Sequence, residues 1–175
     1  MLPSSTRRKT ASRTATVPGL NLSHFLPYRV SVLSNTISQT VARLYEKRFH
    51  ITIPEWRIIA VLGGLGNETL SAGEIAAATA MDKVQVSRAI SRMLGSELIL
   101  REAGDTDRRK ALLTLTAKGL EIYSEIAPLA LAYEAQLTSA LDADEMQQLN
   151  LLLSKLQTKA DELTTAPESR ITRVE

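Results

Sequence analysis

Four capping boxes limit the folds open to this chain more than any other feature of its sequence. In a capping box, a Ser, Thr or Asp before a helix and a Glu or Gln three residues later bond the backbone N–H groups that the helix start leaves free. Each box therefore predicts a helix that begins directly after its first residue. The four boxes are Thr52-Ile-Pro-Glu55, Ser71-Ala-Gly-Glu74, Asp82-Lys-Val-Gln85 and Asp142-Ala-Asp-Glu145.

A long helix is predicted before the first box. Apolar residues recur at steps of three and four between Phe25 and Arg48, which is a helical period. Pro27 fits only in a first turn, so the helix begins near residues 24–27. The stripe is narrow enough to be a seam between two helices, and it consists of Leu26, Val30, Leu33, Ile37, Val41 and Leu44.

Two more long helices are predicted at the other end of the chain. Thr116 can cap a helix that runs from Ala117 to about residue 141, with Pro128 kinking it. The last capping box then opens a helix that ends at about Leu163. Aromatic residues make up only 4% of the chain, which favours helices over a β-sandwich.

Between the third and fourth boxes the pattern changes to that of a β-hairpin. The segments 98–100 and 112–115 are short, apolar and strand-like, and they bracket the charged, glycine-containing run 101–110. An Arg-rich hairpin tip is suited to the negative potential of a narrow minor groove. An aspartate beside the arginines can orient a guanidinium. The tip residues expected to contact DNA are Asp107, Arg108, Arg109 and Lys110.

Residues 74–90 have the pattern of a helix-turn-helix. Ala76 is small where two helices must cross, and Ala80 stands at the turn. The residues expected to be buried are Ile75, Met81, Val86 and Ala89 or Ile90. The second helix then exposes side chains that can bond base edges and phosphates in a major groove, namely Lys83, Gln85, Ser87, Arg88 and Arg92. The alternative is an ordinary helical hairpin with a solvated polar face.

The charges are segregated along the chain. Residues 1–45 carry six basic side chains and no acidic one, and residues 83–116 carry seven basic and four acidic. The segments 46–82 and 117–163 are net acidic. Two basic stretches separated by acidic ones indicate a surface that meets a polyanion on one side, although a merely solvated charge pattern accounts for them equally well.

Composition excludes several classes of function. The chain has no cysteine, which rules out thiol redox sensing, thiolate zinc sites and disulfides. Its two histidines, His24 and His50, are far apart, so no metal site and no cofactor are expected. There is no Gly-rich phosphate loop and no nucleophile with a plausible base, so we do not expect an enzyme. Without a membrane span or a secretory signal, we expect a cytoplasmic protein.

Three segments together resemble the multiple antibiotic resistance regulator (MarR) family. They are residues 53–62, the helix-turn-helix, and Asp107-Arg-Arg-Lys-Ala-Leu-Leu-Thr-Leu-Thr116, which matches the family's wing signature. The resemblance covers roughly residues 22–163, and Ala80 departs from it where the family's turn commonly has Gly. It implies a homodimer, without membrane attachment, that binds a pseudo-palindromic double-stranded operator and usually represses until a small anionic or aromatic molecule binds.

The expected fold is therefore mainly α with a small β-wing. Residues 51–116 would form a winged helix-turn-helix domain, and the helices of 22–50 and 117–163 a dimerisation region. Residues 1–20 read as a mobile basic arm and 164–175 as a flexible tail.

The resemblance also suggests where an effector binds. In the family, the regions around the start of the first and second helices converge on a cleft. The side chains there suit a phenolic carboxylate or its thioester, because they combine rings, hydroxyl, imidazole and guanidinium groups. They are His24, Phe25, Tyr28, Arg29 and Trp56. Two alternatives remain open. Either Phe25 and Trp56 are core residues and Arg29 is solvated, or the protein is a constitutive or architectural DNA-binding protein without an effector.

Overall fold

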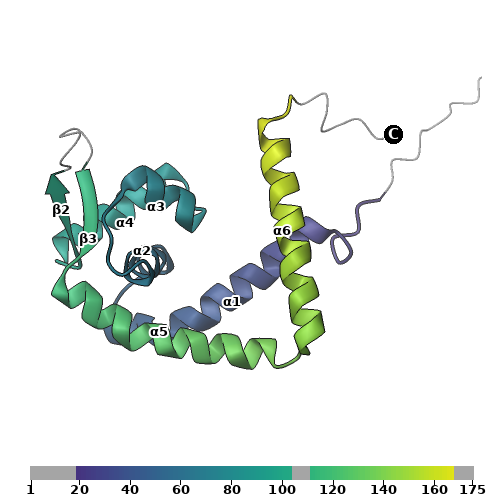
Figure 1. Ribbon diagram of the computed structural model, residues 1–175, viewed down its shortest axis with the longest axis horizontal. Helices are drawn as coiled ribbons and strands as arrows, with labels where there is room; N and C mark the ends of the chain where they lie inside the picture. The colour runs from purple at the N-terminus through teal and green to yellow at the C-terminus, as the bar shows by residue number, and fades with distance from the viewer. Residues whose placement is uncertain (1–18, 104–110, 168–175) are drawn as a thin grey trace, which may run out of the picture. The chain divides into compact units, whose positions relative to one another are not determined.

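The structure is a computed structural model that describes residues 19–103 and 111–167. The chain divides into two compact units, residues 1–38 and residues 39–175. Its described part is mostly helical with one small sheet, as the sequence predicts. In chain order (Figure 1) the elements are α1 (Leu26–Phe49), α2 (Ile53–Gly64), β1 (Leu70–Ser71), α3 (Ala72–Thr79), α4 (Lys83–Gly95), β2 (Ile99–Ala103), β3 (Ala111–Leu115), α5 (Ala117–Thr138) and α6 (Ala143–Thr165).

The first unit contains a turn and the beginning of α1. Asn21 accepts hydrogen bonds through its side chain from the backbone N–H and the hydroxyl of Ser23, at 3.0 and 2.7 Å, and so forms the turn that leads into the helix. The helix begins at Leu26, with Pro27 in its first turn, within the predicted range. From Leu26 to Thr36 every residue is exposed in the single chain.

The predicted capping boxes mark the helix starts of the second unit. Glu55 accepts a bond from the backbone N–H of Thr52 at 2.6 Å, and Glu74 accepts one from that of Ser71 at 2.8 Å. The box at Asp142 is also complete. At α4 only half of the box forms: Asp82 accepts from two backbone N–H groups, but no return bond from Gln85 completes it.

The sheet has the strand order β1-β3-β2 and is antiparallel throughout. The predicted hairpin is confirmed, with Ile99 opposite Leu115 and Arg101 opposite Leu113. The two-residue strand β1 was not predicted. Next to β1, Asn67 bonds the backbone of Leu115 in both directions, at 2.8 and 3.2 Å, and thereby extends the pairing along β3.

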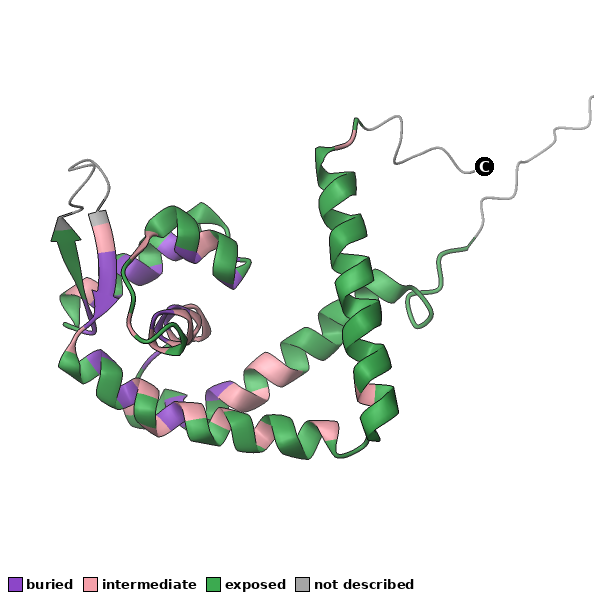
Figure 2. Cartoon of the chain, viewed as in Figure 1, coloured by how far each residue is buried: buried purple, intermediate pink, exposed green. Residues whose placement is uncertain are grey.

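The hydrophobic core lies in the second unit, where α2 packs with α3, α4, the sheet and the first half of α5 (Figure 2). Gly119 lies so close to Leu98 that a Cβ would fall on the Leu98 carbonyl oxygen, which explains a glycine in the first turn of α5. The most deeply buried side chains include Ile58, Ile59, Leu62, Ile75, Val86, Met93, Leu113 and Ile126.

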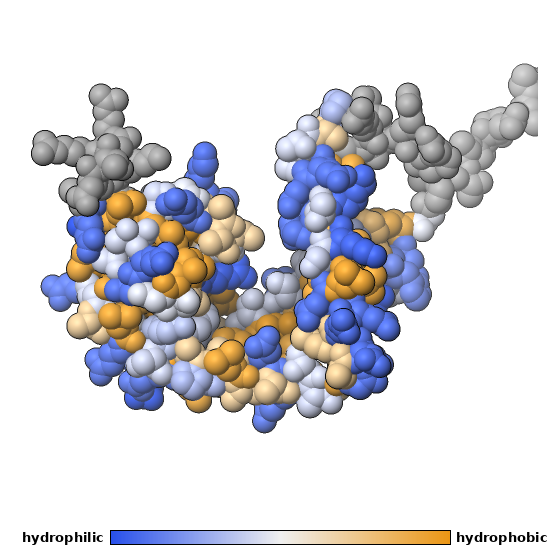
Figure 3. Space-filling model, in the orientation of Figure 1, coloured by the Kyte–Doolittle hydropathy of each residue, from blue (hydrophilic) through white to orange (hydrophobic). Residues whose placement is uncertain are grey.

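The last two helices are much less covered. Thr116 caps α5 by accepting a bond from the Gly119 N–H at 3.1 Å. This helix ends at Thr138, three residues before the predicted end, because Asp142 already caps the next helix. Hydrophobic side chains reach the surface along α5 among hydrophilic ones (Figure 3), and Leu129 and Leu131 are exposed. No residue of α6 is buried.

Candidate nucleic-acid interface

The turn between α3 and α4 has the geometry of a helix-turn-helix. After Thr79 the chain reverses through Ala80, which adopts a left-handed conformation with φ of 51°. Met81 is buried, and Asp82 caps α4 by accepting from the N–H groups of Val84 and Gln85, both at 2.8 Å. The turn thus sets the direction in which α4 leaves the core.

The two faces of α4 differ sharply. Val86, Ala89, Ile90 and Met93 are buried, which confirms the expected core face of this helix. On the other side, the structure leaves exposed the predicted DNA-contacting residues Lys83, Gln85, Ser87 and Arg88. This face therefore offers two cations, an amide and a hydroxyl on one helix, which is the set of groups that bond base edges and phosphates.

Arg92 makes a contact within the fold that the sequence did not predict. Its Nε donates to Glu55 Oε1 at 2.8 Å, and its Nη2 reaches Thr52 Oγ1 at 3.5 Å. The last turn of α4 is thereby bonded to the first turn of α2. This bond holds α4 in place, and the Arg92 side chain is still 54% exposed, so its DNA contact stays a prediction.

Glu55 is the buried partner in this network, with a side chain that is 8% exposed. Burial alone would raise the pKa of the Glu55 carboxyl. The bonds from Arg92 and Thr52 outweigh the burial, so the pKa of Glu55 lies below its ordinary value.

A groove of about 380 Å³ connects α4 with the sheet. Lys83, Ser87 and Ser91 of α4 line it together with Arg101 of β2. Arg101 was not among the predicted contacts. Alternation along β2 indicates its place, because Arg101 follows buried Ile99 by two residues and so lies on the same, helix-facing side of the sheet.

The expected wing contacts Asp107, Arg108, Arg109 and Lys110 lie outside the described residues, as does the basic arm up to residue 18. Of the hairpin, the structure describes the two strands, which follow α4 directly.

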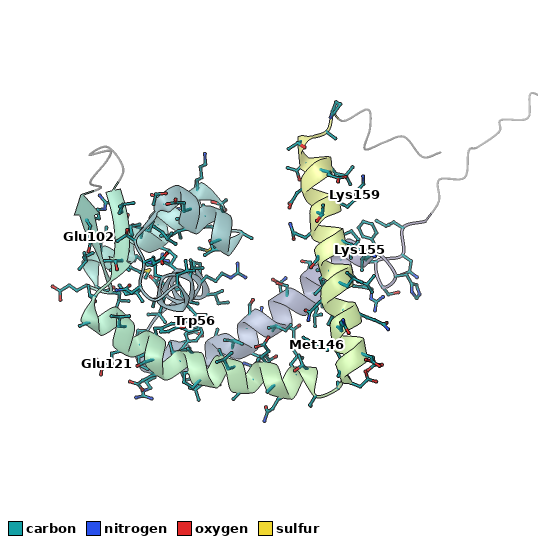
Figure 4. All side chains as sticks on the ribbon, in the orientation of Figure 1. Trp56, Glu102, Glu121, Met146, Lys155 and Lys159 are labelled. Carbon is teal, nitrogen blue, oxygen red and sulfur yellow. The ribbon has the colours of Figure 1, made fainter. Side chains whose placement is uncertain are left out.

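Trp56 lies in a row of aromatic rings within the second unit. Its ring is 5.6 Å from that of Tyr45 on α1 and 6.5 Å from that of Tyr123 on α5. Figure 4 shows Trp56 between α2 and α5. Tyr45 is buried, and burial raises its pKa to about 12. Trp56 is half-buried, so a large part of its ring serves packing.

The other four proposed effector residues, His24, Phe25, Tyr28 and Arg29, belong to the unit of residues 1–38 and are exposed in it.

Within residues 19–103 and 111–167, no three His, Asp or Glu side chains are grouped as a metal site would require. None of the described helices is long and apolar enough to span a bilayer.

Comparisons with known proteins show which proteins this chain is similar to. The sequence profile of the MarR family matches residues 51–110, from the end of α1 to the hairpin. The HTH-type transcriptional regulator BilQ of Clostridium symbiosum (strain WAL-14163) is 34% identical over 83 residues. That stretch is 47% of this chain and 58% of BilQ, so less than two thirds of the relative is matched.

Solved structures extend the likeness to most of the chain. A MarR/EmrR family transcriptional regulator from Acinetobacter sp. ADP1 has a TM-score of 0.74 and 29% identity, covering 82% of this chain and 99% of that one. BpsR of Bordetella bronchiseptica has a TM-score of 0.58 and 24% identity, with 74% and 98% covered, so it shows the fold alone. Its structure concerns the regulation of its DNA binding by 6-hydroxynicotinic acid.

Proposed function

We propose that this chain, which is similar to the MarR family of winged helix-turn-helix transcriptional regulators, represses genes by binding, as a homodimer, a pseudo-palindromic operator. The observation that carries the proposal is the exposed polar and cationic face of α4 opposite its buried face. The relatives named above are transcriptional regulators rather than enzymes, in agreement with the sequence analysis.

In the proposed complex, α4 lies in the major groove. Gln85 can bond an adenine through both ends of its amide, and Arg88 can bond a guanine or a phosphate. Lys83 and Arg101, on the two sides of the groove beside α4, are placed for phosphates. Of the wing residues, Arg108 or Arg109 enters the minor groove, and Asp107 and Lys110 orient and support it.

The test is selection of DNA from a random pool by the full-length protein, followed by binding measurements on the selected duplex. We expect Gln85→Ala to change the selected sequence, and Arg109→Ala to weaken binding by about 1–3 kcal/mol. Thr158→Ala, on exposed α6, is the matched control and leaves binding unchanged. Failure to enrich any sequence, or normal affinity of Arg109→Ala, contradicts the proposal.

The proposed homodimer is supported by leucines that the single chain leaves uncovered. Leu149, Leu152, Leu153 and Leu156 of α6 are between 39% and 55% exposed. They recur at helical spacing, so they form one apolar stripe. An uncovered stripe of this kind is typical of an interface between subunits. The same holds for Leu26, Val30 and Leu33 at the start of α1.

For the effector we propose a small phenolic carboxylate or its thioester. The support comes from the side chains His24, Phe25, Tyr28, Arg29 and Trp56. Arg29 can pair with the carboxylate, Tyr28 or His24 can bond a ring oxygen, and Phe25 can stack on the ring. Trp56 can offer only the part of its ring that Tyr45 and Tyr123 leave uncovered. BpsR shows that the same fold can respond to a hydroxylated aromatic acid.

Titration of the protein–operator complex with benzoates, cinnamates and their thioesters tests this effector. We expect one of them to dissociate the complex, and Tyr28→Phe and Arg29→Ala to reduce that response while leaving operator affinity intact. Only a ligand that binds the DNA-incompetent state more tightly can do so. If none of the compounds dissociates the complex, the protein is a constitutive DNA-binding protein with respect to this class.

A further inference from the structure

One residue on the exposed face of α4 is apolar. Val84 is 58% exposed, in a helix whose other large hydrophobic residues are buried or half-buried. It lies in the first turn, directly before Gln85. The N-terminal residues of a recognition helix are those that contact base edges.

Helix geometry places Val84 at the centre of the exposed face. With 3.6 residues per turn, its side chain points roughly 170° away from the middle of the buried stripe formed by Val86, Ala89, Ile90 and Met93. Arg88 and Ser91, four and seven residues later, follow it along the same line. A surface that binds this face of α4 therefore contacts Val84 in the first turn of the helix.

Nothing in the folding of the single chain favours valine here. Its β-branched side chain has a lower helix propensity than alanine or a long polar residue, and more than half of its surface stays in water. The same branching holds its two methyl groups in one preferred rotamer, so they are presented rigidly. A rigid apolar group suits an apolar partner of small size.

We propose that Val84 reads a thymine in each half-site by contact with the C5-methyl group, which is the apolar feature of the major-groove edge. This rests on the proposed function, since it requires α4 to lie in the major groove. Gln85 beside it is suited to adenine, so the two residues together favour A·T pairs at adjacent positions. Val84 is thus a specificity-determining residue that carries no charge and forms no hydrogen bond.

The experiment removes the C5-methyl group of thymine and the methyl groups of Val84 in separate variants. In the duplex selected by the wild-type protein, each thymine is replaced singly by deoxyuridine, which deletes only the C5-methyl group. At one thymine of the half-site, we expect wild-type affinity to fall about fourfold, the effect of one buried methyl group. For Val84→Ala, whose side chain is a single, shorter methyl group, the difference between the thymine and uracil duplexes should shrink, so that the double-mutant cycle shows coupling at that position.

Two controls keep the result interpretable. Ser91→Ala lies on the same face two turns later and should keep the fourfold response to uracil. Val84→Ala should unfold at the same or a higher temperature than the wild type, because alanine has the higher helix propensity. Equal wild-type affinity for all thymine and uracil duplexes, or an unchanged response in Val84→Ala, overturns the proposal and leaves the proposed function standing. Failure to select any DNA overturns both.

Discussion

At the scale of single residues, Glu55 does more than cap a helix. The same carboxylate that bonds the backbone N–H of Thr52 also bonds Arg92, 37 residues further along the chain. It therefore couples the start of α2 to the end of α4, the helix proposed to enter DNA. Because its pKa is lowered in the folded state, this coupling depends on pH.

The first prediction concerns that dependence. A carboxyl group with a lowered folded-state pKa stabilises the fold at pH values above its unfolded pKa of about 4.3. The stabilisation is lost as the pH falls through the folded-state pKa. We expect Glu55→Gln to lower the free energy of unfolding by about 1–2 kcal/mol at pH 7, because a bond between charged groups is replaced. Urea unfolding at a series of pH values measures this.

Glu162→Gln is the matched control for Glu55→Gln. Glu162 forms an ion pair with Lys159 at 2.9 Å, but both side chains are well exposed, so the change should have little effect at any pH. A loss of stability in Glu55→Gln that stays constant down to pH 3 would contradict the assignment of the pH dependence to this carboxylate.

Sequence reasoning predicted the buried residues of the helix-turn-helix but missed a polar contact within the fold. Ile75, Met81 and Val86 are buried as expected, because periodicity reports which face of a helix meets the core. Arg92 was assigned to DNA because it lies on the polar side of α4. Its bond to Glu55 spans distant parts of the chain, and the local capping role of Glu55 concealed it.

At the scale of elements, local chemistry determined what could be predicted. Helix starts carry their own capping residues, and α2, α3, α4 and α6 begin where the boxes indicated. The strand β1 could not be predicted, since two residues show no alternation and its pairing with β3 depends on a distant segment. Asn67 was missed for the same reason, because its partner Leu115 is 48 residues away.

The turn between α3 and α4 gives the second prediction. Ala80 has φ of 51°, a conformation that costs a residue with a Cβ roughly 1–2 kcal/mol. Glycine avoids that cost but loses more entropy on folding, so we expect Ala80→Gly to raise the free energy of unfolding by about 0.5–1 kcal/mol. Thermal or urea unfolding measures this change.

Ala78→Gly, at an exposed position inside α3, is the control and should lower stability by a similar amount. Lower stability of Ala80→Gly would show that the turn is not strained.

At the scale of the whole molecule, the sequence pattern predicts that α1 and α6 pack along apolar stripes, and the structure of the single chain shows whether those stripes are covered. The narrow stripes of α1 and α6 predict helix–helix seams, but periodicity does not say which helix is the partner. The structure leaves these leucines exposed, so the core of the winged helix does not use them. The homodimer proposed above would cover them with a second subunit.

The last prediction tests that partner through α6. Leu153 and Leu156 are each 47% exposed, and a glutamate at both positions would bury two charges in any interface formed by this stripe. We expect the double variant L153E/L156E to sediment as a monomer at micromolar concentration. Its operator affinity should fall strongly, since two linked recognition helices bind two half-sites and one binds a single half-site. The core made by α2, α3 and α4 does not include α6, so the circular dichroism spectrum of the variant should remain helical. Thr158→Glu, on the opposite face of α6, controls for added charge and should leave the protein dimeric. A monomeric wild type, or a double variant that stays dimeric, would show that the α6 stripe is not the interface.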